Sequence, residues 1–218
     1  MKSRAYAFWH FVLAWFVRIV FFIVRRGSRN EPFPEDGPYI IASNHISALD
    51  PVIVCAVTRR QQPRWMAKSE LFRVPVIGGI IRAWGAYPVE RSGKDAGVVM
   101  KTVSMLGDGM CVGIFPQGTR RPGTDPAETP LRSGLGFICA HSRATVLPVR
   151  ISAPGMRVRP FLPVFVTVGK PITYDEYTKG GTETGSSEIT RFVFDRICSL
   201  DSRGLRGLPP KNDEDNQS

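Results

Sequence analysis

The chain has 218 residues, of which 29 are basic and 19 acidic, so its formal net charge is +10. With 43% apolar residues, 21 glycines and 18 prolines, the composition excludes collagen-like, disordered and coiled-coil proteins. The four cysteines lie far apart without a CxxC pair, which favours reduced, buried thiols over a disulfide framework or a zinc site. The charge itself leaves nucleic acid, a membrane surface or an anionic substrate open as partners.

An apolar segment near the N-terminus predicts attachment to a membrane. Every residue from 5 to 24 is apolar or aromatic except His10 and Arg18. As a helix, this segment would span about 30 Å, the hydrocarbon thickness of a bilayer. The first thirty residues also contain six bases and no acid, which suits anionic lipid headgroups.

Three arrangements of this segment are compared. A secretory signal is disfavoured, because Arg25 and Arg26 stand where small cleavage-site residues are needed. A spanning helix would bury Arg18 at a cost of about 2.5–3.5 kcal/mol. A helix lying in one leaflet, or only partly entering it, keeps Arg18 among lipid phosphates and lets Trp9 and Trp15 anchor in the interface. We place the in-plane arrangement ahead of the spanning one and assign residues 1–27 to a membrane-associated helix.

After a linker rich in Pro, Gly and charged residues at 27–37, short apolar runs alternate with helical patterns. This alternation predicts an α/β fold with a mixed, largely parallel sheet flanked by helices. Residues 28–205 are assigned to this domain and residues 206–218 to a disordered tail. Strands are predicted at 38–43, 64–68, 86–90, 111–115, 145–151 and 162–168, and helices at 51–60, 95–106, 134–143 and 187–203.

One histidine and one aspartate are spaced as a catalytic pair could be. His45 follows a predicted buried strand and precedes Asp50 by five residues, and ligands bind at the carboxyl ends of strands in open α/β sheets. If the chain turns here from strand to helix, Asp50 can orient the imidazole while its other nitrogen takes a proton from a substrate hydroxyl. Alternatively, Asp50 caps a helix and His45 satisfies a turn. The spacing alone leaves both interpretations open.

Several segments together resemble the motifs of a known family. Asn44-His45 with Asp50 resembles the HxxxxD signature of the glycerolipid acyltransferase family. The resemblance covers about residues 38–150, with the motifs in the family's order. Residues 67–71 with Pro75 and Gly78 resemble the segment between its first two motifs, Gly85 to Arg91 its second motif, residues 115–120 its third and residues 147–149 its fourth.

The resemblance implies an enzyme that moves a fatty acyl group from acyl-CoA or acyl-carrier protein to the sn-2 hydroxyl of lysophosphatidic acid, making phosphatidic acid for phospholipid biosynthesis. It implies no metal and no bound cofactor, and a catalytic domain that faces the cytoplasm from the membrane. His45 becomes the general base and Asp50 its partner. The substrate-binding residues that it implies are Arg91, Gly118, Thr119, Arg120, Gln117 and Lys68, although Lys68 is as readily an ordinary solvated lysine.

The residue types fit such an acceptor, since a phosphate suits the planar fork of arginine and the N–H groups of a glycine-containing loop. Gln117 departs from the family, which usually has Glu there, and an amide carries no charge. Another acceptor, such as a lyso-ornithine lipid, therefore stays an alternative, and a non-catalytic basic membrane-binding module is an alternative of another class. The expected partners are a membrane phospholipid surface, a lysophospholipid and the thioester donor. No nucleic acid is expected, because acids nearly balance the bases of the main domain.

Overall fold

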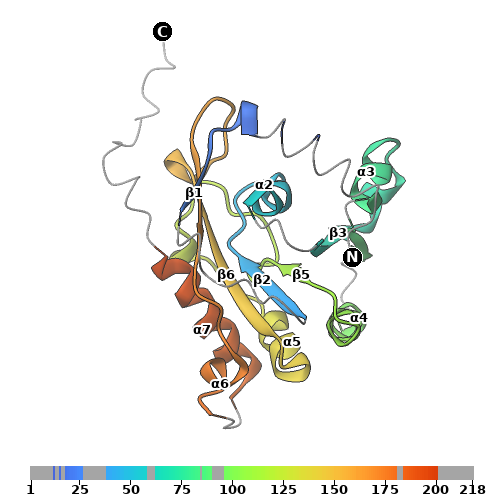
Figure 1. Ribbon diagram of the computed structural model, residues 1–218, viewed down its shortest axis with the longest axis vertical. Coiled ribbons are helices and arrows are strands. Elements are labelled where there is room, and N and C mark those ends of the chain that lie inside the picture. Colours follow the sequence, from blue (N-terminus) through green and yellow to red (C-terminus); the bar gives the residue numbers. More distant parts are fainter. Residues whose placement is uncertain are drawn as a thin grey trace.

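The computed structural model describes residues 18–26, 38–57, 62–83, 85–89, 96–180 and 184–200, together with Val12 and Trp15. Its centre is a seven-stranded sheet of order β1-β7-β6-β2-β5-β3-β4 (Figure 1). All neighbouring strands are parallel except β6 and β7. The predicted α/β fold with a mixed, largely parallel sheet is confirmed.

The strands from β2 to β7 lie within two residues of their predicted bounds. The strands are β1 (Ile23–Arg26), β2 (Tyr39–Ser43), β3 (Arg64–Lys68), β4 (Tyr87–Val89), β5 (Val112–Ile114), β6 (Thr145–Ser152) and β7 (Val164–Val168). The helices are α2 (Asp50–Val57), α3 (Ile77–Ala83), α4 (Ala96–Gly107), α5 (Gly134–Ser142), α6 (Tyr174–Tyr177) and α7 (Ser186–Ser199), with 3-10 turns η1 (Ser69–Arg73), η2 (Pro126–Glu128) and η3 (Pro154–Met156).

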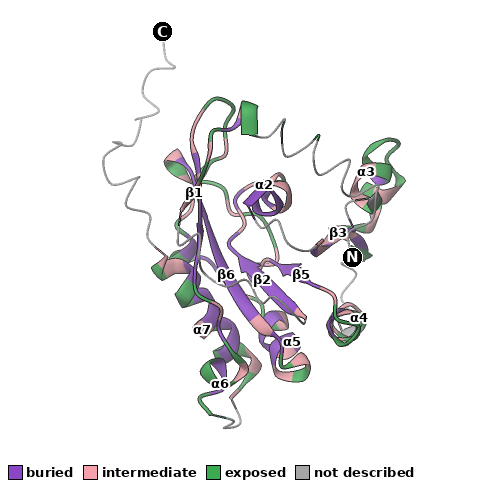
Figure 2. Cartoon of the chain, viewed as in Figure 1, coloured by how far each residue is buried: buried purple, intermediate pink, exposed green. Residues whose placement is uncertain are grey.

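The central strand β2 is buried on both faces, as its unbroken apolar run requires (Figure 2). Tyr39 and Ile41 pack in a core cluster with residues of α2, whereas Ile40 and Ala42 pack with residues of α5 and α7 on the other face. Successive side chains of a strand point to opposite faces, so β2 joins two hydrophobic layers. The loop that follows β2 therefore starts from a strand that packs on both faces.

The helix predicted over residues 5–24 ends earlier than expected. Val12, Trp15 and residues 18–20 are helical, but Ile23–Arg26 forms β1 and pairs with β7, so the prediction of a helix over residues 1–27 is wrong at residues 21–26. The β-branched Ile23 and Val24 favour a strand, and the Val164 N–H donates to the Phe22 carbonyl oxygen at 3.0 Å. Within the part of the chain that the structure describes, no helix is both long and apolar enough to cross a bilayer. The rest of this predicted membrane segment and the predicted tail lie outside the described residues.

The direction of the strands defines one edge of the sheet that matters for the site. The carboxyl ends of β2, β3, β4, β5 and β6 lie together along this edge, which we call the carboxyl edge. Because β7 is antiparallel to β6 and β1 is parallel to β7, both β7 and β1 begin at the same edge. The antiparallel β7 and the additional strand β1 are features that the sequence did not predict.

Candidate active site

His45 and Asp50 face each other in the turn between β2 and α2, at the carboxyl edge. Nδ1 of His45 lies 2.7 Å from Oδ2 of Asp50. The same oxygen accepts hydrogen bonds from the backbone N–H groups of Ile46 at 2.6 Å and Ser47 at 2.7 Å. Asp50 thus bonds residues that precede it rather than the first turn of α2. The geometry favours the catalytic-pair interpretation over the helix-cap interpretation.

Burial decides the chemistry of this pair. The Asp50 side chain is 0% exposed and that of His45 is 16% exposed. Desolvation raises the pKa of Asp50 from its usual value, while the hydrogen bond and charge of His45 oppose this rise. A carboxylate at Nδ1 favours the tautomer with the proton on Nδ1, which leaves Nε2 to accept a proton. The less buried partner is therefore the one that can meet a substrate.

Asn44 connects the turn between β2 and α2, which we call the catalytic loop (residues 44–50), to the neighbouring strand β6. Its side chain is fully buried; Nδ2 donates to the Ile151 carbonyl oxygen at 2.8 Å, and Oδ1 accepts from the Ile151 N–H at 2.7 Å. The Asn44 side chain thus bonds both backbone groups of Ile151, as the backbone of a neighbouring strand would. The residue before His45 consequently cannot turn without breaking two buried hydrogen bonds.

The segment of residues 115–121 holds His45 from the other side. The Phe115 ring stacks on the imidazole with a centroid distance of 4.0 Å and an interplanar angle of 10°. The His45 N–H donates to Oε1 of Gln117 at 2.6 Å, and the Arg121 N–H donates to the His45 carbonyl oxygen at 2.8 Å. The ring and both backbone groups of His45 are thus fixed by the third motif and the residue that follows it.

Gln117 lies beneath the catalytic loop with protein partners at both ends of its amide. It is 2% exposed, and its Nε2 donates to Oγ1 of Thr129 at 2.8 Å. The Thr129 hydroxyl donates in turn to the Pro126 carbonyl oxygen at 2.7 Å. The Thr129 hydroxyl donates its one proton to Pro126, so it can only accept a hydrogen bond from residue 117. An amide at position 117 can donate this bond, whereas a carboxylate cannot. Thr129 was missed at the sequence level; the unusual glutamine, whose NH2 needs an acceptor, was the signal for it.

We expect Thr129→Val to lower kcat by about ten- to hundredfold, because the loosened Gln117 no longer fixes the His45 backbone. The KM for the acyl acceptor should stay unchanged, and Thr129→Ser should restore kcat. Steady-state kinetics on folded variants, checked by thermal unfolding, provide the measurement. A higher KM with unchanged kcat would instead give Gln117 the substrate-binding role that the resemblance implied.

The glycine loop of the third motif lies directly after Gln117. Gly118 has φ +66°, a left-handed backbone that favours glycine, and a Cβ there would lie 3.0 Å from Cδ and Nε of Arg132. Thr119 and Arg120 follow and are exposed. The Arg132 N–H donates to the Pro116 carbonyl oxygen at 2.8 Å, which ties this second arginine to the loop. Arg132 carries no motif of its own, so the sequence offered no signal for it.

The two remaining predicted residues are Lys68 and Arg91. Lys68 is exposed and ends β3, so it lies on the carboxyl edge but two strands away from β2. Arg91 lies outside the described residues. In the described ranges, no three His, Cys, Asp or Glu side chains gather in a way that could hold a metal ion.

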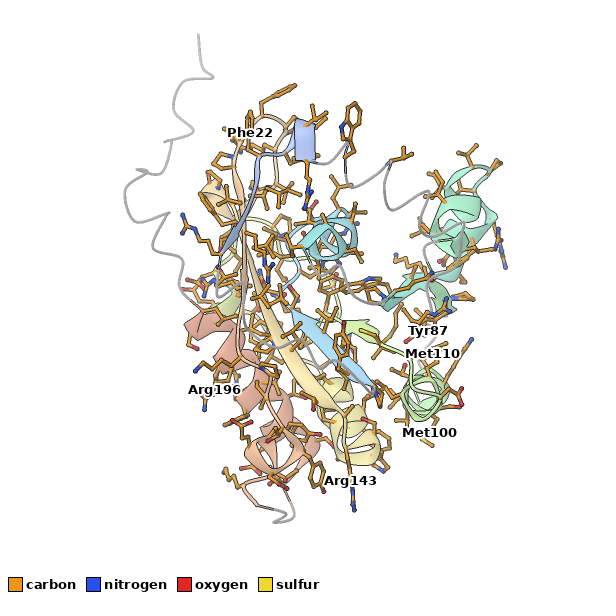
Figure 3. The ribbon with its side chains drawn as sticks, in the orientation of Figure 1. Phe22, Tyr87, Met100, Met110, Arg143 and Arg196 are labelled. Atoms are coloured by element: carbon orange, nitrogen blue, oxygen red, sulfur yellow. The ribbon has the colours of Figure 1, made fainter. Side chains whose placement is uncertain are left out.

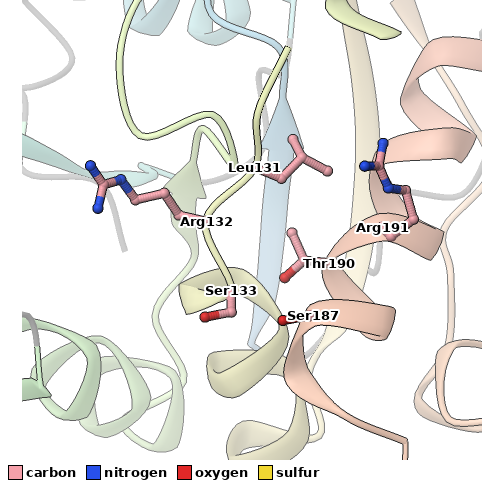
Figure 4. Close-up of a pocket in the computed structure, with 6 residues that line it drawn as sticks. All are labelled: Leu131, Arg132, Ser133, Ser187, Thr190 and Arg191. Atoms are coloured by element: carbon pink, nitrogen blue, oxygen red, sulfur yellow. The ribbon is translucent and has the colours of Figure 1, made fainter. Parts of the chain in front are cut away.

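A cavity of about 200 Å³ lies between the beginnings of α5 and α7 (Figure 4). The Arg132 guanidinium extends away from the other lining residues in this view. None of the residues that the sequence assigns to the site lines this cavity. Its walls are Leu131, Arg132, Ser133, Ser187, Thr190 and Arg191.

The chain is similar to several known proteins. A family model described as "Acyltransferase" matches residues 25–152, which include His45, Asp50 and the third motif. A 1-acyl-sn-glycerol-3-phosphate acyltransferase of Bacillus subtilis is 25% identical over 175 residues, 79% of this chain and 86% of that protein. One of Streptococcus pneumoniae is 27% identical over 163 residues, 71% of this chain and 59% of that protein. One of Borreliella burgdorferi is 33% identical over 131 residues, 59% of this chain and 50% of that protein.

The fold also has a solved counterpart. The crystal structure of the 1-acyl-sn-glycerophosphate (LPA) acyltransferase PlsC from Thermotoga maritima superposes with a TM-score of 0.63. The alignment covers 94% of this chain and 78% of that chain at 21% sequence identity. At this identity the likeness establishes the fold alone.

Proposed function

Since the chain belongs to the acyltransferase family, whose model matches more than half of its residues, we propose that it is a 1-acyl-sn-glycerol-3-phosphate acyltransferase. It moves a fatty acyl group from acyl-CoA or acyl-carrier protein to the sn-2 hydroxyl of lysophosphatidic acid. The observation that carries this proposal is the contact of 2.7 Å between His45 Nδ1 and a carboxylate oxygen of the buried Asp50. This arrangement leaves one nitrogen of an oriented imidazole to act as a base.

The reaction needs one proton to move twice. Nε2 of His45 takes the proton of the acceptor hydroxyl as its oxygen attacks the thioester carbonyl, and Asp50 stabilises the imidazolium that forms. The tetrahedral intermediate then collapses, the carbon–sulfur bond breaks, and the imidazolium returns the proton to the leaving thiolate. The products are an ester and a free thiol, and no acyl-enzyme or metal takes part.

Arg120 of the glycine loop and Arg132 recognise the phosphate of the acceptor in this proposal. Arg120 is exposed in the loop that holds His45, and the Arg132 side chain lies against Gly118 of the same loop. A phosphomonoester offers these planar groups oxygens for paired hydrogen bonds. Arg91 and Lys68 complete the same subsite in this proposal. Gln117 does not bear on the choice of acceptor, because its amide contacts His45 and Thr129.

The enzyme works at a membrane surface in this proposal. Residues 1–27, with their bases and apolar side chains, attach it to the phospholipid, and the catalytic domain faces the cytoplasm. This location gives the active site access to a lipid acceptor on one side and a water-soluble acyl donor on the other. No resident cofactor is required, since the thioester supplies the driving force.

A panel of acceptors tests the proposal. The full-length protein is incubated with lysophosphatidic acid, lysophosphatidylcholine, lysophosphatidylglycerol or a lyso-ornithine lipid, each with acyl-CoA and with acyl-carrier protein, and products are identified by mass spectrometry. We expect kcat/KM to be about ten- to hundredfold higher for lysophosphatidic acid, the value of one or two charged hydrogen bonds.

Arg120→Ala should reduce this preference for the phosphomonoester. The matched control Arg196→Ala removes an exposed arginine of α7 and should keep the preference. Faster acylation of the lyso-ornithine lipid or of a phosphodiester would contradict the proposed acceptor, and lipid binding without any product would favour a non-catalytic module.

A further inference from the structure

The large exposed apolar side chains of the described residues are not spread evenly. Eleven such side chains are exposed, and nine of them belong to three segments that adjoin the carboxyl edge. The other two are Val24 in β1 and Met100 on α4. The nine are Val12, Trp15, Ile19 and Phe22 before β1, Leu71, Val74, Val76 and Ile77 after β3, and Phe161 between β6 and β7.

The sheet topology brings these three segments to the edge that carries His45. The segment after β3 leaves the sheet at the carboxyl edge, as does the catalytic loop after β2. The connection from β6 to β7 lies at the same edge, and β1 begins there beside β7. The Phe161 N–H donates to the Val20 carbonyl oxygen at 2.7 Å, so two of the segments are in contact. In Figure 1, α3 and the start of β1 both lie at the upper side of the molecule, with α2 between them.

Two of these side chains sit at strained turns that hold them out toward solvent. Val76 has φ +65° and is 75% exposed, and Phe161 has φ +60° and is 71% exposed. A left-handed backbone is unfavourable for a bulky residue and above all for a β-branched one. The turn around Val76 is nevertheless hydrogen-bonded, since the Ile77 N–H donates to the Pro75 carbonyl oxygen at 2.7 Å and the Gly78 N–H to the Val74 carbonyl oxygen at 2.8 Å. A strained backbone that keeps an apolar side chain in solvent indicates that this side chain contacts a binding partner.

The charges around these turns identify the chemistry of that partner. Arg73, Arg157 and Arg159 are exposed beside the apolar tips. In the described parts of the three segments, Glu70 is the one acidic residue. Apolar tips surrounded by bases complement a lipid bilayer, which offers hydrocarbon beneath anionic headgroups.

We propose that the carboxyl edge docks on an anionic lipid bilayer, with Val76 and Phe161 entering the interface. This contact adds to the attachment through residues 1–27, because Val76 and Phe161 belong to the folded α/β domain. It turns the catalytic loop toward the leaflet and does not depend on which reaction the site performs. A lipid acceptor could then reach His45 without leaving the membrane surface.

Site-specific fluorescence tests the contact in the full-length protein, whatever the N-terminal segment does. Cys198 is replaced by Ser, and one cysteine is introduced by Val76→Cys, Phe161→Cys or, as control, Met100→Cys and labelled with the environment-sensitive dye NBD. The remaining cysteines are buried, and burial raises the pKa of the Cys111 and Cys139 thiols, so these do not compete for the label. Met100 is 53% exposed on α4 and lies far from Phe22 in Figure 3.

With vesicles of phosphatidylcholine and phosphatidylglycerol, the dye at positions 76 and 161 should shift to the blue and be quenched by nitroxide-bearing lipids. The dye at position 100 should do neither. Unchanged spectra at 76 and 161 on vesicle-bound protein would overturn the proposal. A blue shift that appears in the absence of vesicles, and that nitroxide-bearing lipids do not quench, would also overturn the proposal. A second copy of the chain would then cover the surface.

Binding and activity separate this contact from catalysis. Val76→Asp should weaken partitioning into the same vesicles by about tenfold, and Met100→Asp should leave it unchanged. Acylation of a short-chain acceptor dissolved without vesicles should be normal in Val76→Asp. Unchanged partitioning of Val76→Asp into the vesicles would contradict the proposed docking. Absence of acylation in every protein, including the wild type, would contradict the proposed function but not the docking.

Discussion

Replacing His45 by Ala should lower kcat by about 10²- to 10⁴-fold, the contribution of a positioned general base. Without the imidazole, no group takes the proton from the acceptor hydroxyl and none returns it to the leaving thiolate. The backbone bonds of residue 45 to Gln117 and Arg121 do not need the side chain, so the loop should keep its course. The measurement is the rate of thiol release with saturating acceptor.

His141 provides the matched control for this substitution. It is an exposed histidine on α5 whose Nδ1 lies 2.8 Å from the Phe137 carbonyl oxygen and whose ring also stacks on a phenylalanine. His141→Ala therefore removes the same chemical group and a similar stacking contact away from the site, and it should retain activity. Near-full activity of His45→Ala in folded protein would disprove the mechanism.

Asp50→Asn should have an effect of similar size, a loss of about 10³- to 10⁴-fold in kcat. The amide oxygen can still accept the N–H groups of Ile46 and Ser47, but the charge that stabilises the imidazolium and selects its tautomer is gone. Because the loss arises after binding, the KM for the acceptor should change little. A KM effect without a kcat effect would contradict the assigned role of Asp50.

The same variant should be at least as stable as the wild type at neutral pH. Burial raises the pKa of Asp50 in the fold, so the folded protein binds a proton more tightly than the unfolded chain. Stability is then lost as the pH rises from the unfolded pKa through the folded one, and Asn lacks this titration. Thermal unfolding across this pH range should show a smaller decline for Asp50→Asn. A steeper decline would contradict this sign.

The catalytic pair could be predicted because its signal is local. Five residues separate His45 from Asp50, and a strand-to-helix turn is readable from the apolar run before them and the proline after them. The strands from β2 to β7 were readable for the same reason, since each is a short apolar run between polar turns. Features that depend only on residues close together in the sequence, such as this pair and these strands, can be predicted from the sequence.

The support of the pair could not be predicted, because it depends on contacts between distant segments. Asn44 bonds Ile151, 107 residues away, and Gln117 bonds Thr129 across a loop. The apolar run of residues 5–24 predicts a helix throughout, and only pairing with β7 turns its last residues into a strand. The exposure of Val76 and Phe161 likewise depends on the fold, and the sequence carried no signal for it.

The most direct measurement follows one labelled acyl group. Full-length protein is given lysophosphatidic acid and an acyl donor with an isotopically labelled acyl chain, and lipid products and free thiol are quantified together. We predict equal amounts of labelled phosphatidic acid and thiol, both lost in His45→Ala and kept in His141→Ala. Thiol release without labelled phosphatidic acid, or equal product from His45→Ala, would contradict acyl transfer by this site.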